Sequence, residues 1–213
     1  MSLHSHTGTI LAIASNNQGK IAELRSLLGD AVNIVTLADL GLESPDETGE
    51  TFEENAELKA RYVHSQTGLP ALADDSGLEV DALHGRPGVR SARYAGESAT
   101  DADNRALLLA EMKDIPPARR TARFVSVITL VDESGEVHAA RGACEGIITE
   151  QERGSNGFGY DSLFEFADGQ TMAELDPDEK NRRSHRGQAM RYALPAIRAA
   201  LGMASVNRDV DAP

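Results

Sequence analysis

The sequence has a single cysteine, Cys144, and no tryptophan among its 213 residues. One cysteine excludes an internal disulfide framework, and the other residues offer no spacing typical of a zinc site. We therefore expect Cys144 to be a buried, unreactive thiol. The chain also lacks any apolar stretch that approaches the length of a membrane span, so no membrane association is expected.

The first residues lack the basic region and the following apolar run of a signal peptide, which predicts a cytoplasmic protein. We expect residues 1–8 to be disordered or tag-like and residues 9–202 to form a single domain. Residues 203–213 are polar and without apolar period, as in a flexible tail. No linker or low-complexity stretch indicates a second domain.

Positive charge is scarce, with 21 Lys and Arg against 34 Asp and Glu and a formal net charge of -13. Such a balance argues against a broad basic surface for duplex nucleic acid, so no nucleic-acid partner is expected. A local basic pocket for a small anion remains compatible with this composition.

The first half of the sequence alternates between strand and helix patterns. Residues 9–15 form an apolar run typical of a strand, and apolar residues at helical spacing follow until Gly29. Thr51 and Glu54 have the spacing of a capping box, which predicts the start of a helix. A further helix is expected over residues 102–112.

The second half predicts an antiparallel hairpin and a final helix. Residues 123–131 and 137–150 are strand-like and flank the turn sequence DESGE. Ser184 is expected to cap the last helix, and Pro195 inside it should kink or break it. The pattern as a whole predicts an α/β fold with a long mixed β-sheet and flanking helices.

Two adjacent carboxylates, Asp74 and Asp75, lie between two apolar segments that resemble strand pieces, residues 70–73 and 78–83. Asp, Ser and Gly are typical of a solvated turn. Alternatively, the carboxylates lie at a strand end, where α/β sheets bind ligands. Two close like charges resist joint ionisation unless a cation or a hydrogen-bond donor is nearby.

The segment ASNNQGKIAEL (residues 14–24) joins the first strand to the first helix and resembles a phosphate-binding loop. It is not a Walker loop, because Ala14 and Ile21 replace residues that the Walker spacing requires. Asn16, Asn17 and the helix N-terminus still offer donors to an anion, with Lys20 as a point charge. The alternative is a helix entry with a surface lysine.

Other polar residues also admit two interpretations. Lys59 is typical of a lysine on a helix surface, and Glu47 lies in an acidic loop that is either solvated or a source of oxygen ligands for Mg²⁺. Phe158 and Tyr160 lie in the glycine-rich segment 154–164, where aromatic rings either stack on a base or pack into the core.

Three cationic or titratable residues, Lys180, His185 and Arg186, are expected at the entry of the last helix. Cations are unfavourable at a helix N-terminus unless an anion or a carbonyl is held there. The cluster therefore favours a pocket over a solvated basic patch.

Six segments in register resemble the inosine/xanthosine triphosphate pyrophosphatase family, over about Thr9 to Gly202. They are SNNQGK, TFEENAELKAR, LADDSGLEVDAL, PGVRSARYAG, FGYD and SHRGQA. The resemblance implies two lobes around a central nucleotide cleft, and a homodimer. It also implies Mg²⁺-dependent hydrolysis of noncanonical purine nucleoside triphosphates (ITP, dITP and XTP) to a nucleoside monophosphate and pyrophosphate.

The resemblance further implies roles for individual residues. Asp75 corresponds to the general base and to a Mg²⁺ ligand, with Asp74 and Glu47 as the other metal carboxylates. The triphosphate contacts would be Ser15, Asn16, Asn17, Gln18, Gly19, Lys20 and Lys59. The remaining nucleotide and base contacts would be Ser76, Phe158, Gly159, Tyr160, Asp161, Lys180, His185 and Arg186.

Two other functions remain open at this stage. A nucleotide-binding sensor would use the same pocket without turnover, although the two aspartates argue against it. A magnesium-dependent phosphomonoesterase would release phosphate in place of pyrophosphate. The sequence does not rank ITP, dITP and XTP.

Overall fold

The computed structural model describes residues 10–203 of the chain. The segment 1–8 and all of the predicted tail except Met203 lie outside the described residues. Between residues 10 and 203, no helix is long and apolar enough to span a membrane.

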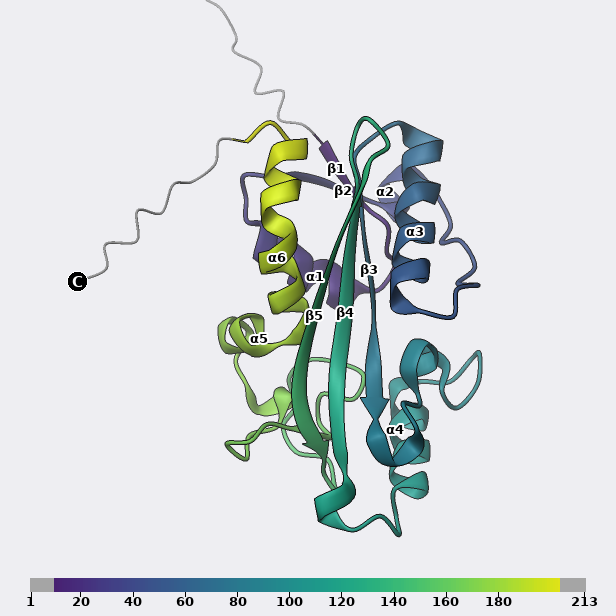
Figure 1. The fold of residues 1–213 in the computed structure, drawn as a ribbon, viewed down its shortest axis with the longest axis vertical. Helices are drawn as coiled ribbons and strands as arrows, with labels where there is room; N and C mark the ends of the chain where they lie inside the picture. Colours follow the sequence, from purple (N-terminus) through teal and green to yellow (C-terminus); the bar gives the residue numbers. More distant parts are fainter. Residues whose placement is uncertain (1–9, 204–213) are drawn as a thin grey trace, which may run out of the picture.

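Six strands form one mixed sheet in the order β2-β1-β3-β4-β5-β6 (Figure 1). The strands are β1 (Ile10–Ile13), β2 (Asn33–Thr36), β3 (Ala71–Val80), β4 (Thr121–Val131), β5 (Val137–Ile148) and β6 (Phe164–Glu165). β1 is parallel to both β2 and β3, whereas β3 to β6 are joined by antiparallel pairing. The predicted mixed sheet and the β4–β5 hairpin are confirmed.

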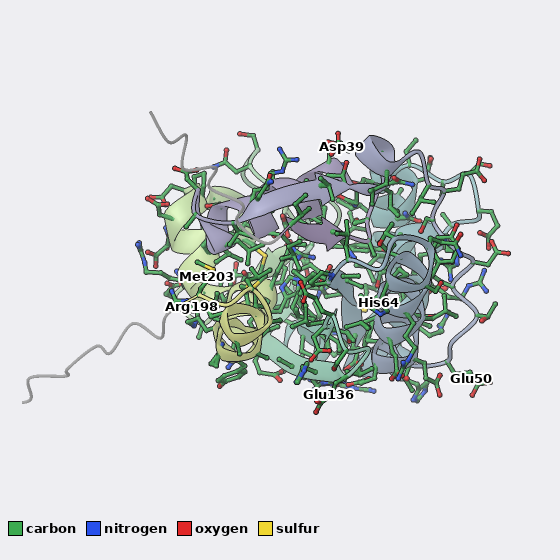
Figure 2. The ribbon with its side chains drawn as sticks, turned by 90° about the horizontal axis from the view of Figure 1, so that it is seen from above. Asp39, Glu50, His64, Glu136, Arg198 and Met203 are labelled. Carbon is green, nitrogen blue, oxygen red and sulfur yellow. The ribbon has the colours of Figure 1, made fainter. Side chains whose placement is uncertain are left out.

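Helices cover both faces of the sheet at one end and leave the other end to α4 and loops (Figure 1). The α-helices are α1 (Gln18–Leu28), α2 (Leu37–Leu40), α3 (Phe52–Thr67), α4 (Asp101–Glu111), α5 (Pro177–Arg183) and α6 (His185–Ala200). Short 3₁₀ turns are η1 (Asp81–Leu83), η2 (Gly88–Arg93), η3 (Pro117–Arg119) and η4 (Met172–Glu174). Seen from above, α6 with Arg198 and α3 with His64 lie on opposite sides, with Glu136 of the hairpin between them (Figure 2).

Local signals set the ends of several helices. Thr51 and Thr100 each form a complete capping box, with Glu54 and Asp103 as the reciprocal partners. The first helix ends at Gly29, whose φ of 75° places it in the left-handed region that favours glycine. These caps confirm the predicted helix starts.

Different apolar layers fill the two faces of the sheet. On the α1/α6 face the core consists largely of Leu11, Ile13, Leu72, Ile128, Leu130, Ile21, Leu24, Met190 and Ile197. On the α3 face it contains the small residues Ala12, Ala14, Ala60, Ala71 and Ala73 together with Leu37, Val63 and Val131. The small side chains allow the α3 backbone to lie close to β3, which positions the polar side chains of α3 at the sheet.

Asp74 and Asp75 lie inside β3, so the prediction of a turn or strand end at this point is wrong. β3 pairs with β4 along its whole length, from Ala71 opposite Val131 to Val80 opposite Ala122. This ladder satisfies backbone groups that a turn would have left to water. β1, however, ends opposite Leu72, so Asp74 lies just past the end of its parallel neighbour.

Pro195 does not break α6, which continues to Ala200. The predicted break is therefore wrong, and the predicted kink stays a prediction. A proline removes the bond to the carbonyl four residues earlier, which belongs to Arg191. Both residues are exposed, so water can solvate that carbonyl.

Candidate active site

The carboxylates of Asp74 and Asp75 point to opposite faces of the sheet, because side chains alternate along a strand. Asp74 meets Lys20 of α1 and Arg186 of α6, whereas Asp75 meets Lys59 of α3. The two adjacent residues are therefore not a pair in space, and each has its own cations.

Asp74 is enclosed by donors on the α1/α6 face. Its Oδ2 lies 2.9 Å from Lys20 Nζ and 3.1 Å from an Arg186 nitrogen, and the Ser126 hydroxyl donates to Oδ1. Burial opposes ionisation, but the Arg186 and Lys20 charges hold the pKa of Asp74 well below its usual range. Asp74 is thus a permanently ionised anchor for this cluster.

Asp75 occupies a different environment on the α3 face. Lys59 Nζ lies 2.7 Å from Asp75 Oδ1 and 2.9 Å from Glu47 Oε1, and Arg93 donates to the other Glu47 oxygen at 2.8 Å. Burial raises the pKa of Asp75 above its ordinary value, against the opposing charge of Lys59. Of the two aspartates, Asp75 is therefore the one more easily protonated.

The two lysines converge where β1 ends. The carbonyls of Pro70 and Leu72 accept hydrogen bonds from β1 and the residue after it, but no strand lies beside the next outward carbonyl, that of Asp74. Lys59 donates to this carbonyl at 3.1 Å and Lys20 approaches it at 3.5 Å from the other face. Because β1 ends there, both ammonium groups can reach the Asp74 carbonyl oxygen.

Lys59 is only 4% exposed, so its interpretation as a helix-surface lysine is wrong. Its ammonium group is balanced by two carboxylates, as burial of a charge requires. The small residues that let α3 approach the sheet could have signalled this burial.

A cavity opens from Lys20 along the α1/α6 face, with about 590 Å³ of empty space including its mouth. Its lining includes ten of the predicted site residues: Asn17, Lys20, Ser76, Phe158, Gly159, Tyr160, Asp161, Lys180, His185 and Arg186. The structure therefore brings together residues that are up to about 170 positions apart in the sequence.

Phe158 joins the aromatic side of the cavity to the first loop. A side chain at Gly19 would come within 2.6 Å of the Phe158 ring, so the absence of a Cβ there permits the contact. The Lys180 ammonium lies 4.8 Å from the centre of the same ring. Phe158 thus contacts both Gly19, at the start of α1, and a cation of the cavity.

The other cations of the cavity are anchored by buried acids. Lys180 contacts Asp161 Oδ2 at 2.7 Å and Glu23 Oε1 at 2.5 Å, and Arg186 also pairs with Glu23. Lys180 lies on α5, not at the entry of the last helix as predicted, because Ser184 separates the two helices. The acids supply the anions that the sequence indicated such a cation cluster needs.

His185 lies flat against Phe124, with ring centroids 4.7 Å apart and planes 12° from parallel. Burial and the neighbouring Arg186 charge hold the pKa of His185 well below its usual range. The imidazole is therefore neutral near pH 7. Cys144 lies beside it and is only partly buried, so the prediction of a buried thiol is met only in part; desolvation raises the pKa of that thiol to about 12.

The remaining predicted residues lie outside the cavity lining. Ser15 is buried and its hydroxyl accepts the Asn17 N–H at 3.2 Å, whereas Asn16 and Gln18 are exposed at the start of α1. These residues place polar groups at the helix entry next to Lys20.

Sequence reasoning missed Glu23 and Arg93. Glu23 follows Lys20 by three positions on α1, a spacing that places both on one helix face and could have identified it. Arg93 lies inside the quoted PGVRSARYAG segment, but only the fold brings it to Glu47.

Glu47 and Asp75 are suited to a hard cation, since their oxygens already share one ammonium group between them. Asp74 differs because its oxygens are held by Lys20, Arg186 and Ser126. Among the described residues, the three predicted metal carboxylates are not gathered into one cluster.

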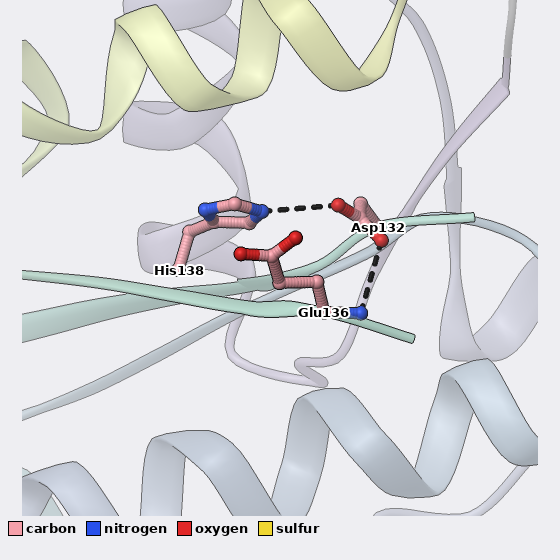
Figure 3. A group of neighbouring side chains, drawn as sticks. All are labelled: Asp132, Glu136 and His138. Atoms are coloured by element: carbon pink, nitrogen blue, oxygen red, sulfur yellow. Dashed lines mark hydrogen bonds and ion pairs between the residues drawn. The ribbon is translucent and has the colours of Figure 1, made fainter. Parts of the chain in front are cut away.

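The carboxylates and imidazole of Asp132, Glu136 and His138 do gather, at the β4–β5 hairpin (Figure 3). Asp132 Oδ1 accepts backbone N–H groups of Ser134 and Glu136, and Oδ2 lies 3.0 Å from His138 Nε2. Both oxygens are used to hold the turn, so this group stabilises the hairpin.

Comparison with known proteins agrees with this geometry. A model of the Ham1 family matches residues 11–196. The dITP/XTP pyrophosphatase of Pectobacterium atrosepticum is 48% identical over 194 residues, which cover 89% of this chain and 98% of that protein. The dITP/XTP pyrophosphatase of Mycobacterium tuberculosis is 51% identical over 197 residues, covering 90% and 96%.

Solved structures show the same fold. A HAM1 protein from Coxiella burnetii matches with a TM-score of 0.81 and 43% identity, covering 90% of this chain and 100% of that one. A nucleoside-triphosphatase, dITP/XTP pyrophosphatase, from Mycobacterium abscessus matches with a TM-score of 0.72 and 48% identity, covering 88% and 100%. With its family model, its relatives and its fold in agreement, the chain belongs to the Ham1 family.

Proposed function

We propose that this chain hydrolyses noncanonical purine nucleoside triphosphates, such as ITP, dITP and XTP, to a nucleoside monophosphate and pyrophosphate. The observation that carries the proposal is a cavity with an aromatic wall at Phe158 and a cation, Lys20, that shares the Asp74 carbonyl with Lys59. A base and a triphosphate need this combination of a stacking surface and converging cations. The similarity to proteins named dITP/XTP pyrophosphatases supports the same reaction.

In this proposal the purine lies against Phe158, and Lys180 and Arg186 recognise its edge. Both side chains only donate hydrogen bonds. They therefore suit the 6-keto oxygen of hypoxanthine or xanthine and offer no acceptor to the 6-amino group of adenine. Neutral His185 closes the cavity beside Arg186, and Ser76, Gly159, Tyr160 and Asp161 complete the proposed contacts.

The triphosphate is proposed to pass from the cavity toward the end of β1. Lys20 and Lys59 neutralise its negative charge from the two faces of the sheet. The polar groups at the N-terminus of α1 contribute amide and side-chain donors. They are Ser15, Asn16, Asn17, Gln18 and Gly19.

Asp75 is proposed as the general base because it is near both lysines and because, of the two aspartates, it is the one whose pKa is raised. It orients a water molecule and accepts its proton as the water attacks the α-phosphorus, and pyrophosphate leaves. Glu47 and Asp75 would hold Mg²⁺, which supplies charge neutralisation to the phosphates when bound. We assign Asp74 chiefly a structural role, although the resemblance also implied it as a metal carboxylate.

The homodimer and the cytoplasmic location implied above remain predictions, as does the absence of a nucleic-acid partner. The single domain over residues 9–202 is likewise a proposal. Sedimentation of the purified protein would test the homodimer directly.

The proposed reaction is tested by ion-exchange analysis of products from ITP, and separately from ATP, with and without Mg²⁺. IMP and pyrophosphate from ITP, little product from ATP and none without the metal are expected. IDP and phosphate would contradict attack at the α-phosphorus. Binding of ITP without any product would favour a nucleotide sensor.

A further inference from the structure

The peptide groups on both sides of Gly159 are held by one helix. The Gly159 N–H donates to Asp101 Oδ2 at 2.8 Å, and the Gly159 carbonyl accepts from Arg105 Nη1 at 2.9 Å. Gly159 stands between Phe158 and Tyr160, and these three residues line the cavity together with Asp101. The two contacts therefore fix the backbone that carries the aromatic wall.

Asp101 and Arg105 can act together because they are four residues apart and share one face of α4. Arg105 Nε also lies 2.9 Å from Glu152, and Glu152 accepts the Ser162 hydroxyl at 2.8 Å. The helix thus holds the loop at its middle and, through Glu152, near its end.

The helix itself is fixed to the segment that includes η2. The buried Asn104 side chain accepts the Ala95 N–H at 2.8 Å and donates to the Ala92 carbonyl at 3.1 Å. The Tyr160 hydroxyl donates to the neighbouring Ser91 carbonyl at 2.8 Å. α4 and η2 therefore form one frame around the loop.

The loop needs such a frame because its conformation is not set by regular secondary structure. Gly154, Gly157 and Gly159 all have positive φ, between 60° and 81°, and no strand or helix spans residues 154–162. Glycine-rich backbone loses much conformational freedom when it is fixed in one such conformation. Contacts from outside the loop must offset this loss.

We propose that Asp101 and Arg105 are positioning residues that hold the base-binding wall of the cavity in its working conformation. The inference rests on the proposed function for its effect on nucleotides, but the tether itself is independent of it. Removing the Asp101 carboxylate frees the Gly159 N–H and lets Phe158 move away from the base.

The test compares Asp101→Ala with Asp103→Ala in the full chain. Asp103 is a matched control, since it closes the capping box at the same end of α4 without contacting Gly159. Asp101→Asn is the rescue variant, because its amide oxygen can still accept the Gly159 N–H. Hydrogen exchange of residues 154–162 and the KM and kcat for ITP are measured for these three variants, for Arg105→Gln and for the wild type.

We expect Asp101→Ala to speed exchange in the loop and to raise the KM for ITP about tenfold, near the upper end of what the loss of one ordinary hydrogen bond causes, with kcat nearly unchanged. Asp101→Asn and Asp103→Ala should stay close to the wild type in both measurements. Arg105→Gln should resemble Asp101→Ala.

Equal exchange and equal KM in Asp101→Ala and Asp103→Ala would overturn the tether. Faster exchange in Asp101→Ala without any change in KM would overturn its role in base binding. A wild-type protein that does not hydrolyse ITP would instead contradict the proposed function, and the exchange measurement would still decide on the tether.

Discussion

Asp74 and Asp75 are neighbours in sequence but differ in the face of the sheet that they occupy, in their cationic partners and in the direction of their pKa shifts. Asp74 lies 1% exposed among Lys20, Arg186 and Ser126, and its pKa is held well below the usual range. Asp75 lies on the other face beside Lys59, and burial raises its pKa. Two carboxylates with diverging pKa values are typical of a division between a fixed charge and a group that moves a proton.

The difference teaches that one strand can serve two purposes at the same point. On the α1/α6 face, β3 contributes an anion that holds the cations of the cavity together. On the α3 face, it contributes a carboxylate that faces the lysine at the end of β1. Substitutions on the two faces test this division.

Asp75→Asn should lower kcat for ITP about 100- to 10,000-fold, the usual contribution of a general base. The fold should persist, because Lys59 keeps Glu47 as a partner. Steady-state kinetics with circular dichroism would check both expectations. Undiminished turnover would remove Asp75 as the base.

Asp74→Asn should act mainly on stability. The change leaves the buried Arg186 and the partly buried Lys20 without their shared carboxylate, and breaking a buried pair in this way costs about 3 to 5 kcal/mol. Urea unfolding compared with Asp75→Asn would measure it. A larger loss of stability in Asp75→Asn than in Asp74→Asn would reverse the assignment of the two faces.

Exchange of each lysine for glutamine should separate the two faces further. Lys59→Gln leaves Asp75 and Glu47 without their common ammonium, whereas Asp74 keeps Arg186 in Lys20→Gln. We expect each variant to reduce kcat/KM for ITP about 10- to 100-fold, because each lacks one cation of the proposed triphosphate site. The loss of stability should be larger in Lys59→Gln. Equal free energies of unfolding for Lys59→Gln and Lys20→Gln would contradict this expectation, which rests on the tighter burial of Lys59.

Ser76→Ala should lower the stability of the protein only slightly, although Ser76 contacts Asp74 on the α1/α6 face. The Ser76 hydroxyl accepts from Arg186 at 2.9 Å and donates to Asp74 at 3.2 Å, but both charged groups have other partners. Loss of about 1 kcal/mol in the free energy of unfolding is expected, as for a typical hydrogen bond. Urea unfolding of the variant and the wild type would detect this loss. A loss of more than about 3 kcal/mol would show that Ser76 is needed to hold Asp74 and Arg186 together.

Cys144→Ala should change ITP hydrolysis least, by less than about twofold, since a partly buried thiol with a pKa of about 12 carries almost no thiolate at neutral pH. In the folded wild type, alkylation by iodoacetamide should be slow at pH 8 and become fast after unfolding in urea. Rapid labelling of the folded protein would mean that the α6 face is not closed to solvent.

Much of the architecture could be predicted from local patterns. The capping boxes at Thr51 and Thr100, the stop at Gly29 and the β4–β5 hairpin all depend on residues within a few positions of one another. Such interactions are complete within one segment, so the sequence displays them directly.

The environment of the site could be predicted only in part. The order of the motifs identified ten of the fifteen residues that line the cavity, but Lys59 was indistinguishable from a surface lysine until α3 packed on the sheet. Glu23 and Arg93 were missed because their partners, Lys180 and Glu47, are distant in sequence.

Local sequence signals predicted several helix ends, the β4–β5 hairpin and most polar residues of the proposed site. Which carboxylate meets which cation depended on packing. Strand alternation sends Asp74 and Asp75 to different faces, and the end of β1 lets Lys20 and Lys59 reach one carbonyl. These are long-range contacts, and their geometry exists only when the sheet and its helices have packed.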